Sequence, residues 1–200
     1  NWNVSIMAVK FVNSSGSGTT ADAILSVQYT TMMGVRLTSN SWGGGSFSQA
    51  LYDAIAAAGA ANIAFVAAAG NNGANSDTSP AYPAAYDLAN IISVAATDDT
   101  DALASFSNYG AVSVDLGAPV VDILSTLPGN QYGLNSGTSM ATPHVAGAYA
   151  LALSVSAPGI PVAQVKNILL SSVDHTPAMA GKCVSNGRLN IFFAIAEPDT

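Results

Sequence analysis

The sequence is poor in cysteine, in positive charge and in long apolar runs. Cys183 is the single cysteine, so no disulfide can form within the chain and no CxxC or zinc-ligand set exists. Only 8% of the 200 residues are charged, and 5 basic residues stand against 12 acidic ones. So few cations cannot neutralise a phosphate backbone or an anionic lipid surface, which excludes nucleic acid and membranes as expected partners.

The apolar runs and the start of the sequence bear on how the chain is organised. No apolar run is long enough to span a bilayer, because Gly, Ser or Pro interrupts each one. No charged segment followed by an apolar one opens the chain, so no secretory signal is recognised. Asn1 is not an initiator methionine and stands beside an apolar pattern, so we expect the N-terminus to be an internal boundary of a longer domain. Half of the residues are apolar, which predicts one packed core.

Strand and helix signals alternate along the first half of the chain. Thr19 and Asp22 form a capping box that opens a helix, which Gly34 ends, and Ser48 opens a second helix that runs through Ala58 and is closed by Gly59. Apolar runs before, between and after these helices predict strands at 4–9, 35–40 and 62–69. This order is typical of a parallel sheet with right-handed crossovers.

The second half adds strands, a hairpin and three helices. We expect strands at 91–96 and 111–116, paired runs at 120–127 and 131–135, and helices at 140–154, 162–171 and 188–196. Residues 1–200 are therefore predicted to form one partial α/β domain, with helices on both faces of a mainly parallel sheet.

The eleven residues 137–147 read Gly-Thr-Ser-Met-Ala-Thr-Pro-His-Val-Ala-Gly. They place Ser139 at a helix N-terminus, where unpaired backbone N–H groups and the positive end of the dipole meet its hydroxyl. Those groups can stabilise an oxyanion beside the hydroxyl, and Gly137 lets a substrate backbone approach. Pro143 falls in the first turn of the predicted helix, where proline is tolerated. The alternative is that Ser139 merely caps a buried helix.

Residues 67–73 form a second candidate segment, Ala-Ala-Ala-Gly-Asn-Asn-Gly, at the end of an apolar strand. Sites in open α/β sheets lie at the carboxyl ends of strands, which makes Asn71 a candidate site residue. The alternative is an asparagine that serves only the turn.

Both segments resemble those of the subtilisin-like serine peptidases, and they occur in the same order. The resemblance covers nearly the whole chain and corresponds to the C-terminal two-thirds of that catalytic domain, a three-layer αβα fold that here lacks its N-terminal portion. It implies that Ser139 is the nucleophile for peptide-bond hydrolysis, with Asn71 and the Ser139 N–H as oxyanion donors. It also implies a peptide or protein substrate, an extracellular location, and chemistry that needs no cofactor. Met140, next to the nucleophile, should then lie near the reaction centre.

The resemblance further implies two edges that bind an extended substrate by backbone hydrogen bonds. Residues 40–44 resemble the strand that lines the first substrate pocket, and residues 18–20 resemble the opposite edge. The small residues 68–70 would form the other wall of the pocket and leave room for a large apolar side chain. The predicted substrate-binding residues are Ser41, Trp42, Gly43, Ala68, Ala69, Gly70, Gly18 and Thr19. The alternative for Trp42 is a role in the core.

The catalytic base and its acid are the main departure from the family pattern. The Asp-x-Gly and His-Gly-x-His-Val-Ala-Gly segments that should precede this region are missing from the sequence. His144 follows Ser139 by five residues, about 140° round a helix, and should point away from the hydroxyl. His175 follows Asp174, but adjacency in sequence does not make a dyad. We therefore expect little or no peptidase activity from the isolated chain, with Asp and His supplied by the absent segment, as a separate N-terminal piece, or by a partner chain.

Calcium is the one ion that the resemblance suggests, in a structural role. Ala84, Tyr86 and Asp115 loosely match a weak cation site made of backbone oxygens and one acid. The alternative is that Asp115 is a solvated loop acid.

Three hypotheses on function therefore stand: an endopeptidase, a peptide-binding fragment or pseudoenzyme that does not turn over, and a dinucleotide-binding domain. The lack of a G-x-G-x-x-G motif argues against the third.

Overall fold

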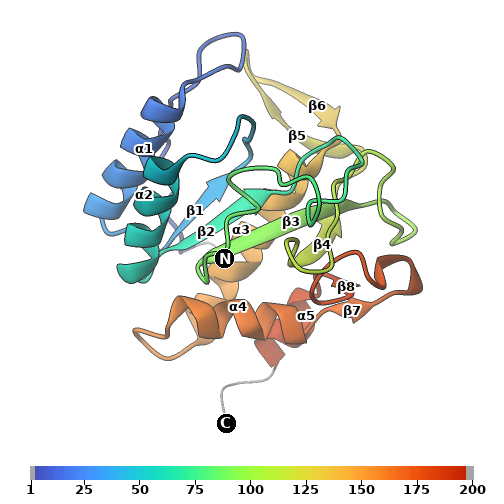
Figure 1. The fold of residues 1–200 in the computed structure, drawn as a ribbon. Helices are drawn as coiled ribbons and strands as arrows, with labels where there is room; N and C mark the ends of the chain where they lie inside the picture. The colour runs from blue at the N-terminus through green and yellow to red at the C-terminus, as the bar shows by residue number, and fades with distance from the viewer. Residues whose placement is uncertain (1–2, 197–200) are drawn as a thin grey trace.

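The computed structural model of the protein describes residues 3–196, and its centre is a six-stranded sheet with the order β1-β2-β3-β4-β8-β7 (Figure 1). Its strands are β1 (Leu37–Asn40), β2 (Ala64–Ala68), β3 (Ile91–Thr97), β4 (Leu116–Pro119), β8 (Gly187–Arg188) and β7 (Asp174–His175). All neighbours are parallel except β7, which is antiparallel to β8. The mainly parallel sheet expected from the sequence is confirmed.

Helices cover both faces of this sheet (Figure 1). They are α1 (Thr20–Met32), α2 (Gln49–Ala60), α3 (Thr138–Val155), α4 (Val162–Ser171) and α5 (Ile191–Ala196), with a short 3-10 helix at Pro177–Met179. α1 and α2 pack on the face that carries Phe65 and Ile91, whereas α3, α4 and α5 pack on the face that carries Val66 and Ile92. Successive strand residues point to opposite faces, and both faces are buried, which confirms the three-layer αβα architecture.

Several local signals act as predicted. The Thr19 hydroxyl accepts a 3.1 Å hydrogen bond from the N–H of Asp22, and the chain leaves α1 through Gly34 at φ 66°. The hairpin of β5 (Ile123–Leu127) and β6 (Gln131–Asn135) turns through Gly129 and Asn130, both with positive φ. It projects from the body at the upper right of Figure 1 and leads directly into α3.

The predicted strand at 4–9 is wrong, since these residues adopt no regular structure. A strand needs a hydrogen-bonding neighbour, and β1 pairs only with β2 among the residues described. Ile6 is 95% exposed, so its apolar side chain finds no core to cover it.

The predicted strand at 111–116 is also wrong, because β4 begins at Leu116 and residues 111–113 form a turn. The Asp77 carboxylate accepts hydrogen bonds from the N–H groups of Val112 and Ser113. These donors therefore bind a side chain in place of a neighbouring strand.

Two helix limits differ from the predictions. α2 continues through Gly59 instead of ending before it. A β-carbon on Gly59 would lie 2.7 Å from Oδ1 of Asn90, so this glycine permits close packing. The left-handed residue that follows the helix is Asn62, at φ 61°. The helix expected at 188–196 begins only at Ile191, because Gly187 and Arg188 form β8.

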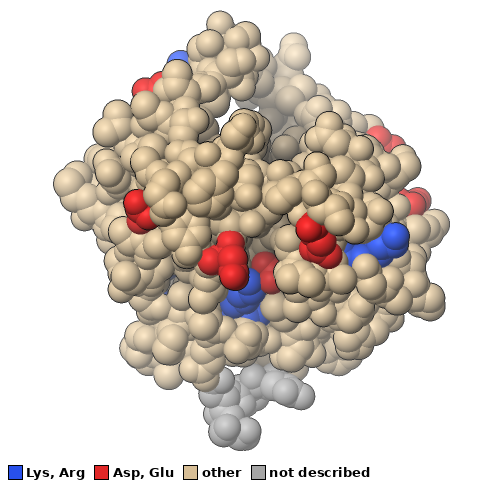
Figure 2. Space-filling view, in the orientation of Figure 1, with Lys and Arg blue, Asp and Glu red and all other residues tan. Residues whose placement is uncertain are grey.

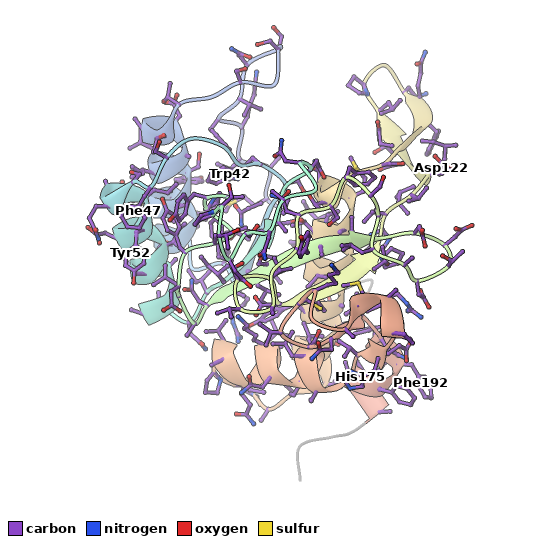
Figure 3. The ribbon with its side chains drawn as sticks, turned by 45° about the vertical axis from the view of Figure 1, so that its right-hand side comes forward. Trp42, Phe47, Tyr52, Asp122, His175 and Phe192 are labelled. Carbon is purple, nitrogen blue, oxygen red and sulfur yellow. The ribbon has the colours of Figure 1, made fainter. Side chains whose placement is uncertain are left out.

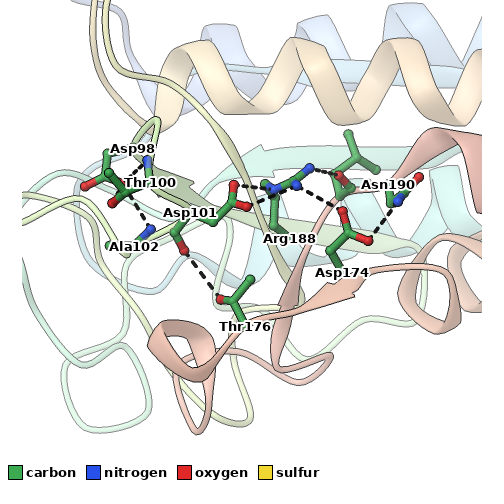
Figure 4. Close-up of polar contacts among 9 residues, drawn as sticks. Asp98, Thr100, Asp101, Ala102, Asp174, Thr176, Arg188 and Asn190 are labelled. Carbon is green, nitrogen blue, oxygen red and sulfur yellow. Dashed lines mark hydrogen bonds and ion pairs between the residues drawn. The ribbon is translucent and has the colours of Figure 1, made fainter.

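Arg188 ties the C-terminal strands to the body (Figure 4). Its guanidinium lies 2.5 Å from Asp101, which follows β3, and 2.9 Å from Asp174 in β7. Asn190 donates a 2.8 Å hydrogen bond to the other oxygen of Asp174. Both oxygens of Asp174 are thus engaged in holding the edge of the sheet, and neither is hydrogen-bonded to His175.

Candidate active site

The carboxyl ends of β1 and β2 meet the N-terminus of α3. Ser41, just after β1, donates a 2.7 Å hydrogen bond from its hydroxyl to the carbonyl of Ser139. In return the Ser139 hydroxyl lies 3.4 Å from the carbonyl of Ser41. Two residues separated by 98 positions in the chain are thereby brought together at the edge expected for a site in an open α/β sheet.

Pro143 explains why the carbonyl of Ser139 is available to the Ser41 hydroxyl. The sequence places Pro143 in a first helical turn, but α3 begins at Thr138, so Pro143 lies one turn further on. Proline lacks the N–H that would bond the carbonyl four residues earlier, which belongs to Ser139. The Ser41 hydroxyl takes that place, so the missing helical bond becomes a link between α3 and β1.

The first turn of α3 leaves the N–H of Ser139 without a partner inside the helix. The N-cap is Gly137, at φ 153°, and it offers no side chain to the helix. Ser139 is the second helical residue, which overturns the alternative that it merely caps the helix. Its N–H belongs to the first turn, where no carbonyl of the helix can accept it.

The amide of Asn71 is oriented by Thr138. Asn71 Oδ1 accepts hydrogen bonds from the N–H of Thr138 at 2.9 Å and from its hydroxyl at 3.0 Å. Because both partners are donors here, the oxygen must face Thr138, and Nδ2 must face the other way. The buried Thr138 hydroxyl also accepts the N–H of Gly70 at 3.2 Å, which fixes the position of the threonine.

Two N–H donors border one space beside Gly137. A β-carbon built on Gly137 would lie 3.6 Å from Asn71 Nδ2, 3.8 Å from Ser139 N and 3.7 Å from Asn71 Oδ1, which is bonded to Thr138. Glycine leaves this space open, and an oxygen atom placed there can approach both donors. The arrangement can therefore stabilise negative charge that develops next to the Ser139 hydroxyl.

Two residues of the predicted first pocket, Ser41 and Gly70, contact the start of α3. Ala68 and Ala69 are buried at the end of β2, and Gly70 is half-buried. A β-carbon on Gly43 would lie 3.1 Å from the carbonyl of Tyr82, so this glycine lets two backbone segments approach closely. Substrate binding by these residues stays a prediction.

Trp42 packs against other aromatic rings, whether or not it also contacts a substrate. Its half-buried ring lies 5.1 Å from that of Phe11 and 6.1 Å from that of Phe65, and its indole N–H donates to Asn40. Phe11 in turn covers Gly18, where a β-carbon would lie 2.8 Å from the Phe11 ring. The two predicted substrate edges, at Ser41–Gly43 and at Gly18–Thr19, are thus joined through the rings of Phe11 and Trp42.

Neither histidine is placed to serve Ser139. His144 Nδ1 lies 2.8 Å from the carbonyl of Met140 on its own helix. His175 lies in β7, at the opposite edge of the sheet from β1, and five strand spacings put roughly 24 Å between those edges. Figure 3 shows His175 beside Phe192, far from Trp42. Within residues 3–196, therefore, no histidine is hydrogen-bonded to the candidate nucleophile.

The three residues suggested for calcium are not brought together by any contact. Asp115 is only 8% exposed, and its oxygens are taken by the Lys166 ammonium at 2.8 Å and by the N–H of Ser93 at 2.8 Å. Burial raises the pKa of Asp115, and Lys166 opposes that rise. Ala84 and Tyr86 are buried on the α1–α2 face, with the Tyr86 hydroxyl bound to backbone. Asp115 is thus neither solvated nor free to bind a cation without displacing Lys166, and calcium binding stays a prediction.

The charges on one face and the metal-binding side chains of the described residues bear on competing sites. Figure 2 shows scattered charges on this face, with no broad basic patch. In the part of the chain that is described, no helix is long and apolar enough to cross a bilayer, and no three His, Cys, Asp or Glu side chains form a metal-binding group.

Sequence reasoning missed two residues of the site. Thr138 was visible only as part of the nucleophile motif, and its anchoring of Asn71 is a contact across 67 positions. Asn108, which binds the loop that carries Asn71, stands in a segment that sequence analysis did not single out.

Comparisons with known proteins agree with this geometry. The sequence profile of the peptidase S8 family, the subtilase family, matches residues 1–190. Subtilisin DY from Bacillus licheniformis is 45% identical over 174 residues, 86% of this chain and 62% of the relative. Thermitase from Thermoactinomyces vulgaris is 38% identical over 191 residues, 96% of this chain and 65% of the relative. The chain thus spans less than two thirds of the length of these two relatives.

Solved structures show the same fold. The crystal structure of a cold adapted subtilisin-like serine proteinase superposes with a TM-score of 0.81 at 34% sequence identity, over 90% of this chain and 64% of that one. The prenylagaramide maturation protease PagA gives a TM-score of 0.80 at 29% identity, over 93% of this chain and 70% of that one. Profile, relatives and fold coincide, and the chain belongs to the subtilase family of serine proteases.

Proposed function

We propose that this chain supplies the nucleophile, the oxyanion hole and the substrate groove of a subtilisin-like serine endopeptidase. The observation that carries the proposal is the open space beside Gly137, which Asn71 Nδ2 and Ser139 N both border. The Ser139 hydroxyl belongs to the same helical turn, so one bound carbonyl group can meet the nucleophile and both donors.

The reaction then follows from these positions. Ser139 Oγ attacks the carbonyl carbon of the scissile peptide bond while a base takes the hydroxyl proton. The carbonyl oxygen becomes negative, and Asn71 Nδ2 and the Ser139 N–H stabilise it. The tetrahedral intermediate collapses, the leaving amine receives the proton, and an ester remains on Ser139. Water hydrolyses that ester by the same sequence of steps.

The base and its orienting acid come from outside the described residues. The Ser139 hydroxyl faces the carbonyl of Ser41, a neutral acceptor that cannot take its proton. We propose that the N-terminal segment of the family's catalytic domain carries the Asp and His, pairs with the edge of β1 that is free among the described residues, and covers exposed apolar residues such as Ile6. The isolated chain should therefore show little or no peptidase activity. An extracellular location and a structural calcium ion stay predictions.

A fluorophosphonate probe tests this proposal directly. The purified 200-residue chain is treated alone, and again after addition of a fragment that bears an Asp-x-Gly strand end and a His-Gly-x-His segment. We expect labelling and peptide turnover only in the mixture, and neither with a Ser139→Ala chain. The His175→Ala chain should behave like the unaltered one. Rapid stoichiometric labelling of the chain alone, lost in His175→Ala, would contradict the proposal and assign the base to His175.

A non-catalytic peptide-binding role is the second candidate. It is favoured by the mutual hydrogen bonds of Ser41 and Ser139, which hold the groove together without a base. Peptide binding in a mixture that never labels would support this candidate over the endopeptidase.

A further inference from the structure

Asn108 lies beneath the loop that carries Asn71. It stands between β3 and β4, and only 2% of it is exposed. A buried amide costs free energy unless its polar atoms are bonded. Every hydrogen bond of the Asn108 side chain goes to the backbone of residues 69–74.

The contacts of Asn108 enclose Asn71 from both sides. On one side, Nδ2 donates to the carbonyl of Ala69 at 2.9 Å. On the other, Oδ1 accepts the N–H groups of Asn72 at 3.0 Å and Ala74 at 3.1 Å. The backbone N–H of Asn108 adds a bond to the carbonyl of Gly70 at 2.9 Å. The Asn108 side chain thus binds the backbone two residues before Asn71 and immediately after it, while the Asn108 backbone binds the residue immediately before it.

Only an amide of this size satisfies these contacts. The carbonyl of Ala69 requires a donor, while the two N–H groups require an acceptor, and an uncharged Asn provides both. Gly70 completes the fit, because a β-carbon there would overlap Asn108 Nδ2 and because its φ is 107°. Neighbouring backbone bonds from Gly73 to Phe106 and from Ser76 to Tyr109 align the two loops.

We infer that Asn108 is the positioning residue of the oxyanion hole, a role that rests on the function proposed above. Thr138 orients the side chain of Asn71, and Asn108 sets the place of its Cα. Both are needed to hold Nδ2 at the space beside Gly137, since an oxyanion donor acts only within a narrow range of distance.

Nuclear magnetic resonance of the 200-residue chain tests the positioning without any catalysis. The Thr138 amide donates to Asn71 Oδ1, so its hydrogen exchange, measured relative to the Val145 amide inside α3, reports how firmly Asn71 is seated. In Asn108→Ala, Thr138 exchange should rise by about tenfold or more relative to Val145, and the Asn71 side-chain amide signals should shift. An unchanged ratio with unshifted Asn71 signals would overturn the inference.

Asn90→Ala is the matched control. Asn90 is also buried, at 4% exposed, and its amide binds the backbone carbonyls of Ile55 in α2 and of Ile63 just before β2. It should lower stability while leaving the ratio of Thr138 to Val145 exchange unchanged. If Asn108→Ala does not fold, Asn108→Asp keeps the volume and both accepted bonds but loses the donor to Ala69. It should still raise the Thr138 exchange ratio, and an unchanged ratio in this variant would equally overturn the inference.

Kinetics in the complemented enzyme separate this inference from the proposed function. Asn108→Ala should lower kcat by about tenfold or more with little change in KM, and adding it to Asn71→Ala should cost little further kcat, because both act through one donor. If Asn71→Ala itself leaves kcat unchanged, the proposed oxyanion hole fails. If Asn71→Ala lowers kcat but Asn108→Ala does not, or if the two losses add in full, the positioning role fails alone.

Discussion

Replacing Asn71 by alanine should lower the kcat of the complemented enzyme by roughly 10²–10³ and leave KM nearly unchanged. The two ends of the Asn71 amide have different contacts: Oδ1 accepts hydrogen bonds from Thr138, and Nδ2 borders the space beside Gly137. Asn71 is exposed, so water can replace Oδ1 at Thr138, and the folded state should lose no more than about 1 kcal/mol. The loss in rate corresponds to roughly 2.7–4 kcal/mol of transition-state stabilisation from one missing donor.

Two further variants isolate that donor. Asn71→Asp keeps an acceptor for Thr138 but replaces Nδ2 by a carboxylate oxygen, which repels the developing oxyanion; its kcat should be at least as low as that of the alanine variant. Asn72→Ala changes the exposed neighbour and keeps the backbone N–H that binds Asn108, so its kcat should stay unchanged.

Steady-state kinetics on a peptide ester and a peptide amide, with the burst of acyl-enzyme recorded, measure these effects. An unchanged kcat in Asn71→Ala would refute the oxyanion assignment. A rise in KM with constant kcat would instead make Asn71 a residue that binds substrate and transition state equally.

Three other predictions concern oxidation, backbone strain and a buried charge. Peroxide should slow the complemented enzyme by forming the sulfoxide of Met140, and Met140→Ala should resist; equal sensitivity of both would remove Met140 from the site. Gly70→Ala should lower the free energy of unfolding by about 1–3 kcal/mol in urea titrations, because φ is 107° and the methyl group overlaps Asn108, and an unchanged midpoint would contradict this. Lys166→Met should cost roughly 3–5 kcal/mol at neutral pH, because Asp115 loses its partner. Without Lys166, the pKa of the buried Asp115 lies further above its value in the unfolded chain, so the folded state binds more protons than the unfolded state. The free energy of unfolding of Lys166→Met should therefore fall as pH rises from about 4, and this pH dependence should vanish in the double variant Asp115→Asn/Lys166→Met.

The helix N-terminus that carries Ser139 and the parallel sheet could be predicted because their signals are contiguous. Residues 137–147 carry the glycine, the serine and the backbone N–H groups in one stretch of chain. In the structure Gly137 is the N-cap of α3, and the residues after it belong to that helix. β2 and β3 are buried on both faces, and uninterrupted apolar runs of their length predict such strands well.

Elements that depend on distant partners could not be predicted in this way. The strand expected at 4–9 has no neighbour in the described sheet, and the one expected at 111–116 loses its donors to Asp77, about 35 positions earlier. Asn108 reaches Ala69 across 39 positions, and nothing in the local pattern distinguishes it from a turn asparagine. Hydrogen bonds of this kind depend on how loops cross, which short sequence patterns do not encode.

The places where local rules fail nevertheless converge on Ser139. α3 starts without a side-chain cap at Gly137, it contains Pro143, and the loop facing it passes through the left-handed Gly70. Each departure has a specific compensation: Asn71 accepts the Thr138 N–H, Ser41 bonds the carbonyl that Pro143 leaves free, and Asn108 fills the space above Gly70. Local irregularities that are each satisfied by a contact from a different segment are expected where a fold has been adapted to a site. Their common position, at one end of the sheet, supports the catalytic region proposed above, because the compensating contacts come from segments outside residues 137–147.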